Sequence, residues 1–286
     1  MSFKQKLQNF NELVVFEHSI FSLPFIFIAM VVAQRGWFGV KLLILGLLAA
    51  ISARNFAMAV NRYLDRDVDA LNPRTKNRPS VDGRVSKAEM LGFIAINAAI
   101  FIAVAYFINS LAFKLSVPIL FILAIYTLFK RFSSLAHIVL GISLGLAPIA
   151  GAVSVLGSIP SWVVYLSIGV TFWVAGFDLL YSLQDMEFDK KHNLHSIPSK
   201  LGAKNTLALA LGFHIITVIF WYLFVKSASL HLFAYLAVVV GALMLGYEHY
   251  LVRKDFTKID RAFFTVNGYL GFIFFILIIA DVAIYG

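Results

Sequence analysis

The chain has 286 residues, of which 60% are hydrophobic and 14% are charged, and its formal net charge is +9. A soluble domain carries about 25% charged and about 45–50% apolar residues, so this composition excludes an ordinary cytosolic globule and a disordered chain. The absence of cysteine also excludes a small secreted domain held by disulfides, which leaves an all-α integral membrane protein.

Stretches nearly free of charged residues predict nine transmembrane helices, because a spanning helix needs about 20 mostly apolar residues. In chain order they are residues 18–34, 42–61, 90–113, 115–129, two spans within 132–177, 205–225, 227–247 and 262–280. A Gly-Ser-Ile-Pro sequence at 157–160 predicts the turn between the two spans that share one apolar stretch. Residues 1–17 mix charged and apolar side chains, which predicts an amphipathic surface segment and not a cleavable signal peptide.

Small residues and tryptophans predict how these helices pack. Gly141, Gly145 and Gly151 are expected to let neighbouring helices approach closely. Trp37, Trp162 and Trp221 lie near expected span ends, where tryptophan commonly anchors a helix at the membrane interface.

The distribution of lysine and arginine predicts the orientation in the membrane. With nine spans, 20 of the 24 basic residues fall on one side. Cytoplasmic loops carry the excess of basic residues, so we expect a cytoplasmic N-terminus, an external C-terminus and a multi-pass protein of the cell (inner) membrane. The same bias accounts for the net positive charge without a nucleic-acid partner.

The first of two acidic clusters lies in residues 61–69. Asn61, Asp65 and Asp69 follow one another at intervals of four residues, which places them on one side of a helix. Asp67 points to another side. Acidic side chains at membrane depth are costly and by default mark a functional site.

The second cluster lies in residues 178–189. Asp178, Asp185 and Asp189 are spaced by seven and four residues and again share one helical side, whereas Glu187 does not. Both clusters fall on the expected cytoplasmic side.

Together the clusters predict a magnesium and diphosphate site. Carboxylates that face one another do not all ionise cheaply without a cation, and Mg²⁺ prefers oxygen ligands, one or two carboxylates per ion, and substrate phosphates. Basic residues that suit phosphate follow in the same loops: Arg74, Arg78, Lys130, Arg131 and Lys190. The alternative is an ordinary solvated, basic cytoplasmic loop, and two clusters that are both in helical register argue against it.

Arg54 interrupts an otherwise apolar span seven residues before Asn61, on the same helical side. It is either a snorkelling or paired arginine, or a ligand for an anion in the cavity. The seven histidines are scattered and predict no transition-metal site.

These motifs resemble those of the UbiA family of intramembrane aromatic prenyltransferases, and the resemblance covers residues 1–286 as a single domain. The family motif NxxxDxxxD is matched by Asn61, Asp65 and Asp69, and DxxYxxxDxxxD is matched by Asp178, Tyr181, Asp185 and Asp189. The family's Arg-Thr-x-Asn-Arg-Pro matches residues 74–79, and its Tyr-x-x-x-Lys-Arg is matched by Tyr126, Lys130 and Arg131. The sequence departs from many members at His195, where they have lysine.

The resemblance implies nine helices that enclose a cavity and a Mg²⁺-dependent reaction. Its metal ligands would be Asn61, Asp65, Asp69, Asp178, Asp185 and Asp189. Its catalytic residues would be Asp65, Asp69, Asp185, Asp189 and Tyr181. Its substrate-binding residues would be Asn61, Arg54, Arg74, Arg78, Tyr126, Lys130, Arg131 and Lys190. Tyr63, Tyr126 and Tyr181 would present aromatic faces to an allylic cation.

The implied substrates are a polyprenyl diphosphate and an aromatic acid, 4-hydroxybenzoate above all, in the biosynthesis of ubiquinone or menaquinone. Apart from the lipid bilayer and these substrates, no obligate protein partner is expected. Three alternatives stay open. They are another aromatic acceptor in an alternative menaquinone route, an ion-coupled membrane transporter, and a Mg²⁺-dependent transferase that makes phospholipids.

Overall fold

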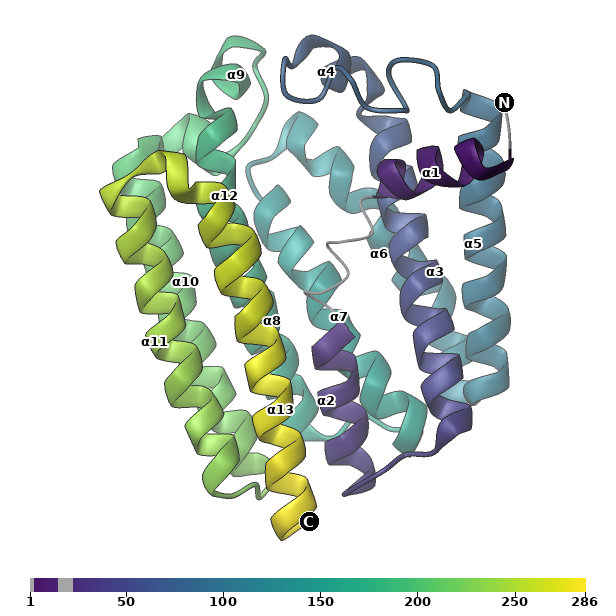
Figure 1. The fold of residues 1–286 in the computed structure, drawn as a ribbon, viewed down its shortest axis with the longest axis vertical. Helices are drawn as coiled ribbons and strands as arrows, with labels where there is room; N and C mark the ends of the chain where they lie inside the picture. The colour runs from purple at the N-terminus through teal and green to yellow at the C-terminus, as the bar shows by residue number, and fades with distance from the viewer. Residues whose placement is uncertain (1–2, 15–22) are drawn as a thin grey trace.

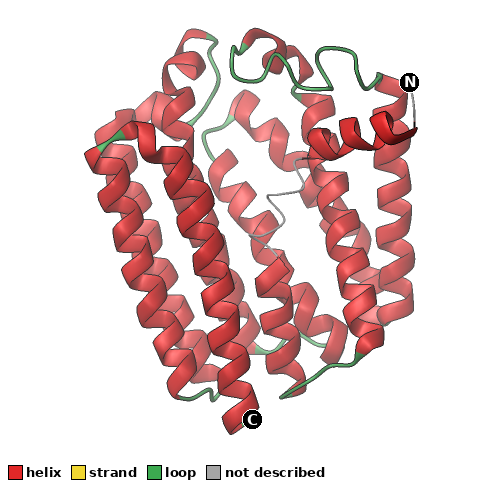
Figure 2. Ribbon diagram, viewed as in Figure 1, coloured by secondary structure: helices red, strands yellow, loops and turns green. Residues whose placement is uncertain are grey.

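The structure, a computed structural model, describes residues 3–14 and 23–286. The described elements are helices that run side by side along the long axis of the molecule (Figures 1 and 2). The long helices are α3 (Val40–Leu64), α5 (Lys87–Ile108), α6 (Ser110–Phe132), α7 (Ala136–Leu156), α8 (Ser161–Tyr181), α10 (Ile197–Ser227), α11 (Leu232–Lys254) and α13 (Asn267–Tyr285). The integral membrane, all-α class predicted from composition is confirmed.

Eight of the described helices are long and apolar enough to cross a membrane, and they coincide with eight of the nine expected spans. The remaining span, at 18–34, corresponds in the described residues to the 12-residue helix α2 (Leu23–Gln34). Residues 15–22 lie outside the described part of the chain. The count of nine spans and the sidedness of the termini therefore stay predictions.

Several short helices gather at one end of the bundle. In Figure 1, α1 (Phe3–Val14), α4 (Arg66–Leu71) and α9 (Met186–Lys191) lie near this end, whereas the last turn of α13 lies at the opposite end. Both acidic motifs lie at this end of the bundle. Helix α3 ends at Leu64 with Asp65 as its C-cap, and α8 is followed after Tyr181 by the 3₁₀ helix η2 (Ser182–Asp185). Between α11 and α13 lie three short elements: η3 (Phe256–Lys258), α12 (Ile259–Arg261) and the π-helical turn η4 (Ala262–Val266).

Aromatic side chains of four helices meet in the main core, which also contains many aliphatic residues. The Phe25 ring of α2 lies 5.1 Å from Trp173 of α8 and 6.0 Å from Trp221 of α10, and Trp221 lies 4.7 Å from Phe274 of α13, measured between ring centroids. Trp221 has no exposed surface, so the prediction that it anchors a span at the interface is wrong. Helix α10 continues beyond the expected span end, and Trp221 lies on its buried face.

The glycines of α7 bring it against its neighbours, as the sequence predicts. A Cβ atom at Gly141 would collide with the Thr171 carbonyl oxygen of α8, and one at Gly151 would collide with the Ile26 carbonyl oxygen of α2. Helices α3, α5 and α6 form a second, smaller core. Helix α7 contacts helices of both cores, and the cavity described next is lined by residues of both.

Candidate active site

A cavity of about 460 Å³ opens among α3, α6, α7 and α8. Its inner wall is apolar and is lined by residues such as Ala49 and Ala53 of α3 and Ile149 and Ala150 of α7. Its other end holds the acidic motifs. An apolar chamber with charged groups at one end is suited to a ligand with a long hydrophobic part and an anionic head.

The first motif places three oxygen-bearing side chains on the cavity. The Asn61 amide donates to Asp65 Oδ2 over 3.1 Å, and Asp65 and Asp69 both line the cavity. Asp69 is buried, and both of its oxygens lie 2.7 Å from Arg78 Nη1. The side chain of Asp67 is 65% exposed and lies outside the cavity lining. The four-residue spacing therefore separates the cavity side from the solvent side as the sequence suggests.

The second motif reaches the same cavity from α8, η2 and α9. Asp178 lies 2.7 Å from His137 Nδ1, and Asp185 forms an ion pair of 2.6 Å with Arg74. Asp189 is only 1% exposed. Its Oδ1 atom lies 3.2 Å from Lys130 Nζ without accepting a hydrogen bond.

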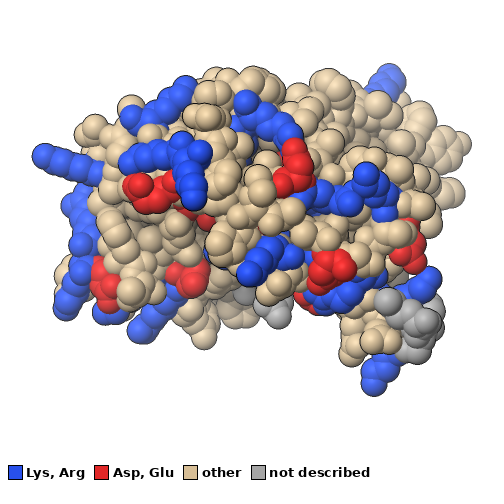
Figure 3. Space-filling view, turned by 90° about the horizontal axis from the view of Figure 1, so that it is seen from above, with Lys and Arg blue, Asp and Glu red and all other residues tan. Residues whose placement is uncertain are grey.

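Not every predicted basic residue reaches the cavity. Arg74, Arg78, Lys130 and Arg131 line it, whereas Lys190 is exposed, lies outside the lining and pairs with Glu187 over 3.1 Å. The position of Lys190 therefore does not support the role expected for it. The end of the molecule that carries the motifs shows arginine, lysine and carboxylate side chains close together (Figure 3).

Arg131 lies at the rim of the cavity. Its guanidinium donates to both Asp67 oxygens over 2.6 and 3.0 Å and to the Leu64 carbonyl oxygen over 2.6 Å. These bonds tie the end of α6 to the end of α3. Arg131 is therefore already used to join the two helices.

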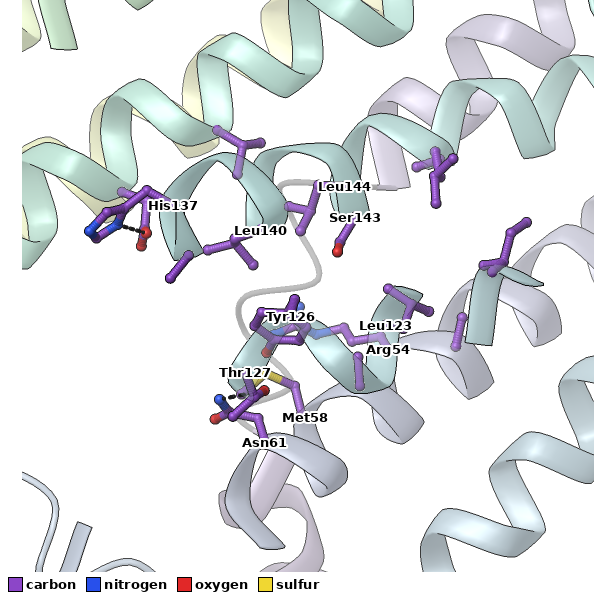
Figure 4. Close-up of a pocket in the computed structure, with 18 of the residues that line it drawn as sticks. Arg54, Met58, Asn61, Leu123, Tyr126, Thr127, His137, Leu140, Ser143 and Leu144 are labelled. Carbon is purple, nitrogen blue, oxygen red and sulfur yellow. Dashed lines mark hydrogen bonds and ion pairs between the residues drawn. The ribbon is translucent and has the colours of Figure 1, made fainter. Parts of the chain in front are cut away.

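Aromatic residues and one arginine complete the walls. Arg54 lies near Tyr126 on one wall of the cavity, opposite Leu144 of α7 (Figure 4). Tyr181 lies at the charged end, where its hydroxyl accepts from Arg74 over 3.2 Å. Tyr63 does not contribute an aromatic face here, because it packs against a separate cluster that contains Leu13 and Met90.

Four residues of the site were missed by the sequence reasoning. Asn72 donates to Asp185 over 3.3 Å, Arg62 donates to Asn61 over 2.9 Å, Thr127 accepts from Asn61 over 3.2 Å, and His137 holds Asp178. Arg62 and Asn72 flank the first motif, so proximity to that motif was the available signal. His137 follows the basic pair of α6 by only a few residues, but nothing in its spacing marks it.

The side chains fit Mg²⁺ by their chemistry. All six predicted ligands are oxygen donors and line one cavity. Burial, together with the neighbouring Asp69 carboxylate, raises the pKa of Asp65 to about 6, and the nearby Lys130 and Arg131 offset this only in part. Within the described residues, no three acidic or histidine side chains are close enough to form a metal cluster. Instead, basic residues pair with three of these carboxylates: Arg74 with Asp185, Arg78 with Asp69 and Lys130 with Asp189.

The chain is similar to known prenyltransferases. The model of the UbiA prenyltransferase family matches residues 22–279. A 4-hydroxybenzoate octaprenyltransferase of Idiomarina loihiensis is 30% identical over 251 residues, which cover 86% of this chain and 87% of that protein. A protein of the same name from Vesicomyosocius okutanii is 24% identical over 90% of this chain and 93% of its own length.

Solved structures share the fold. The apo structure of a UbiA homologue from Aeropyrum pernix matches with a TM-score of 0.84 and 34% identity, covering 93% of this chain and 98% of that one. A UbiA homologue from Archaeoglobus fulgidus, bound to DMAPP and Mg²⁺, matches with a TM-score of 0.77 and 22% identity over 96% of this chain and 99% of that one. The helical arrangement described above is therefore that of these proteins.

Proposed function

This chain belongs to the UbiA prenyltransferase family, and we propose that it transfers a polyprenyl group from a polyprenyl diphosphate to 4-hydroxybenzoate in a Mg²⁺-dependent reaction of quinone biosynthesis. We propose further that it does so from the cytoplasmic side of the inner membrane, with nine spanning helices. The relatives named 4-hydroxybenzoate octaprenyltransferase support the choice of acceptor. The excess of basic residues on the side that carries the motifs supports the orientation.

One observation carries the proposal. Two sets of oxygen donors, far apart in the chain, meet with three basic residues at the charged end of one apolar cavity. Arg74, Arg78 and Lys130 already bind carboxylates of both motifs. A diphosphate offers these cations a better partner, because it carries more charge and more acceptor oxygens than a carboxylate.

The residues of the chain account for each requirement of the reaction. Arg74, Arg78 and Lys130 would neutralise the diphosphate of the donor, while the apolar wall would receive its prenyl tail. Mg²⁺, when bound by the two motifs, supplies Lewis-acid stabilisation of the diphosphate leaving group, which is worth several kcal/mol. The apolar wall of the cavity would shield an allylic cation from water. Tyr126 and Tyr181 present aromatic faces to that cation.

The acceptor chemistry suits a para-hydroxylated aromatic acid. Its phenol oxygen activates the adjacent ring carbon toward an electrophile. Its carboxylate needs a cationic partner, since an unpaired charge in an apolar cavity is expensive. Arg54 lines the cavity on the apolar side of the first motif and can supply that partner.

A reconstitution assay tests the proposal. The purified protein is incubated with a polyprenyl diphosphate, Mg²⁺ and a panel of aromatic acids, and products are identified by mass spectrometry. We expect C-prenylated 4-hydroxybenzoate, with formation abolished by EDTA and restored by Mg²⁺. Failure to prenylate any aromatic acid would refute the proposed acceptor class, and activity without a divalent metal would refute the proposed metal dependence.

A second acceptor is favoured by one observation. His195 and Ser196 line the cavity, and His195 stands where many family members have lysine. If a larger aromatic acid reacts and 4-hydroxybenzoate does not, the chain serves an alternative menaquinone route.

A further inference from the structure

The first residue of each acidic motif is held by a side chain from the corner between α6 and α7. Near the end of α6, Thr127 accepts a hydrogen bond from the Asn61 amide over 3.2 Å. At the second residue of α7, His137 lies 2.7 Å from Asp178. Both contacts are drawn as dashed lines in Figure 4, on opposite walls of the cavity.

His137 has one polar contact in the described structure. Its Nδ1 atom contacts Asp178 Oδ2, while its Nε2 atom is buried and has no hydrogen-bond partner among the described residues. The residue is only 6% exposed. An Nδ1–H group that donates to one carboxylate oxygen fixes the plane of that carboxylate and leaves the other oxygen available. The ring therefore acts as a donor directed at Asp178.

Thr127 has the matching position for the first motif. It is 4% exposed, and its hydroxyl oxygen accepts a hydrogen bond from the Asn61 amide nitrogen. The same nitrogen also donates to Asp65. This arrangement turns the Asn61 amide nitrogen toward α6 and Asp65. The amide oxygen, the atom suited to a metal, is thereby turned away from both and accepts a hydrogen bond from Arg62 over 2.9 Å, which a metal ion would replace.

The same corner also reaches the rest of the acidic motifs. Lys130, between Thr127 and His137 in the chain, pairs with Asp189 and accepts the backbone N–H of His195 through its carbonyl oxygen. A segment of eleven residues thus contacts both motifs.

We propose that His137 and Thr127 are positioning residues that orient Asp178 and Asn61 for metal binding. This inference rests on the proposed Mg²⁺ site. Side chains that hydrogen-bond to metal ligands fix their orientation, and their loss typically lowers metal affinity about 10- to 100-fold. Neither residue needs to touch the metal or the substrate.

The experiment measures metal binding without turnover. Mn²⁺, which is visible by electron paramagnetic resonance, is titrated into the purified full-length protein with an unreactive prenyl thiodiphosphate. We compare His137→Leu, which removes the donor, with His137→Asn, which keeps an N–H close to the Nδ1 position, and include Thr127→Val, which removes only the hydroxyl. The matched control is His192→Leu, since His192 is at the same end of the molecule but outside the cavity lining.

We expect His137→Leu and Thr127→Val to weaken Mn²⁺ binding about 10- to 100-fold. His137→Asn should restore most of the affinity, and His192→Leu should leave it unchanged. Thermal melting of each variant shows whether the fold is retained. The rescue by asparagine separates positioning from packing, because asparagine fills the space of the ring less well than leucine does.

Two results overturn the inference in distinguishable ways. If His137→Leu and Thr127→Val bind Mn²⁺ as tightly as the wild type, or if His137→Asn is as weak as His137→Leu, the positioning role falls and the metal site stands. If the wild-type protein binds no Mn²⁺ even with the thiodiphosphate, the proposed metal dependence falls as well.

Discussion

Arg74 and Asp185, which are 111 residues apart in the chain, form a two-point ion pair, with Nη2 2.6 Å from Oδ2 and Nε 3.2 Å from Oδ1. The pair joins the loop after α4 to the 3₁₀ helix η2, and so joins the first acidic motif to the second. Both oxygens of Asp185 are taken up by the guanidinium. In the proposed reaction Arg74 would exchange Asp185 for the diphosphate of the donor, which would free the Asp185 oxygens for a metal ion.

The exchange predicts the effect of Arg74→Gln. The loss of a charge-assisted hydrogen bond, worth about 1.5–3 kcal/mol, should raise the KM for the prenyl diphosphate about 10- to 100-fold. The KM for the acceptor should change little. Steady-state kinetics with each substrate varied in turn measures both values.

Lys76→Gln is the matched control for this prediction. Lys76 lies in the same loop, carries the same charge and is exposed outside the cavity. An equal rise in KM for both variants would show that Arg74 acts through the general charge of the loop and not through direct contact.

The acidic residues should divide into two groups according to their position. Replacing Asp65, Asp69, Asp185 or Asp189 by asparagine should each lower turnover by at least about 10²-fold, because each weakens metal-assisted departure of the diphosphate. Asp67→Asn and Glu187→Gln should have small effects, since these side chains are 65% and 77% exposed and lie outside the cavity. Comparable losses at Asp65 and Asp67 in single-turnover assays would contradict the assignment of the cavity side.

The spacing of the first motif predicted its geometry even though the helix is interrupted there. Asp65 departs from helical angles, yet its N–H still bonds to the Asn61 carbonyl oxygen and the Asp69 N–H bonds to that of Asp65. The chain therefore keeps the periodicity of a helix across the break. The spacing of the motif was sufficient to predict which side these residues share, because hydrogen bonds within the motif determine it.

The partners of the acidic residues were not predictable in this way. Which cation meets Asp185 depends on how the two halves of the chain pack, and the spacing along one segment carries no such information. His137 and Lys190 also show that position in the sequence does not reveal whether a side chain reaches the cavity. The histidine had no recognisable pattern and reaches the cavity, whereas the lysine follows the second motif directly and does not. Trp221 was misplaced because its burial comes from α2 and α13, which are distant in sequence.

The pKa of Asp65 predicts how metal binding depends on pH. Burial and the nearby Asp69 raise this pKa to about 6, so below about pH 6 the metal-free protein holds a proton that Mg²⁺ must displace. The affinity for Mg²⁺ should therefore fall as the pH drops below about 6, by up to about tenfold per pH unit for one proton. Mn²⁺ titrations between pH 5 and 8 measure the effect, and an affinity that is flat between pH 5 and 7 would contradict it.

The stability of the metal-free protein should change over the same range. An unfolded aspartate loses its proton near pH 4, while folded Asp65 keeps it to about 6. The folded state thus binds more protons in between, and the contribution of Asp65 to the free energy of unfolding should decrease as the pH rises from about 4 to about 6. The difference between the wild type and Asp65→Asn in unfolding experiments from about pH 4 to about pH 7 measures this contribution.

The membrane orientation can be tested independently of activity. A reporter inserted next to His192 should be cytoplasmic, and one fused after Gly286 should be external, because α9 and the end of α13 lie at opposite ends of the bundle (Figure 1). Paired phosphatase and fluorescent-protein fusions measure the two positions. A cytoplasmic signal from both would show that an even number of spans separates the two positions, in place of the three expected.

The last prediction assigns the acceptor carboxylate to Arg54. Arg54 and Arg131 both line the cavity and both carry a guanidinium. Arg131 is bound to Asp67 and to the Leu64 carbonyl oxygen at the rim, whereas Arg54 lies on the cavity wall beside Tyr126, seven residues before Asn61 in the same helix (Figure 4). A guanidinium binds a carboxylate through two parallel hydrogen bonds, which lysine does not reproduce.

Arg54→Lys should therefore raise the KM for 4-hydroxybenzoate about 10-fold through the lost hydrogen bond, while the KM for the prenyl diphosphate stays within about twofold, as expected when ground-state binding of one substrate is lost. Arg131→Lys is the control and should leave the acceptor KM unchanged. A phenol without the carboxylate, such as 4-hydroxybenzyl alcohol, should show the same KM with the wild type and with Arg54→Lys, because neither arginine nor lysine then has a charge to pair. If Arg54→Lys instead raises only the KM of the prenyl diphosphate, Arg54 contacts the donor, and the carboxylate of the acceptor binds elsewhere in the cavity.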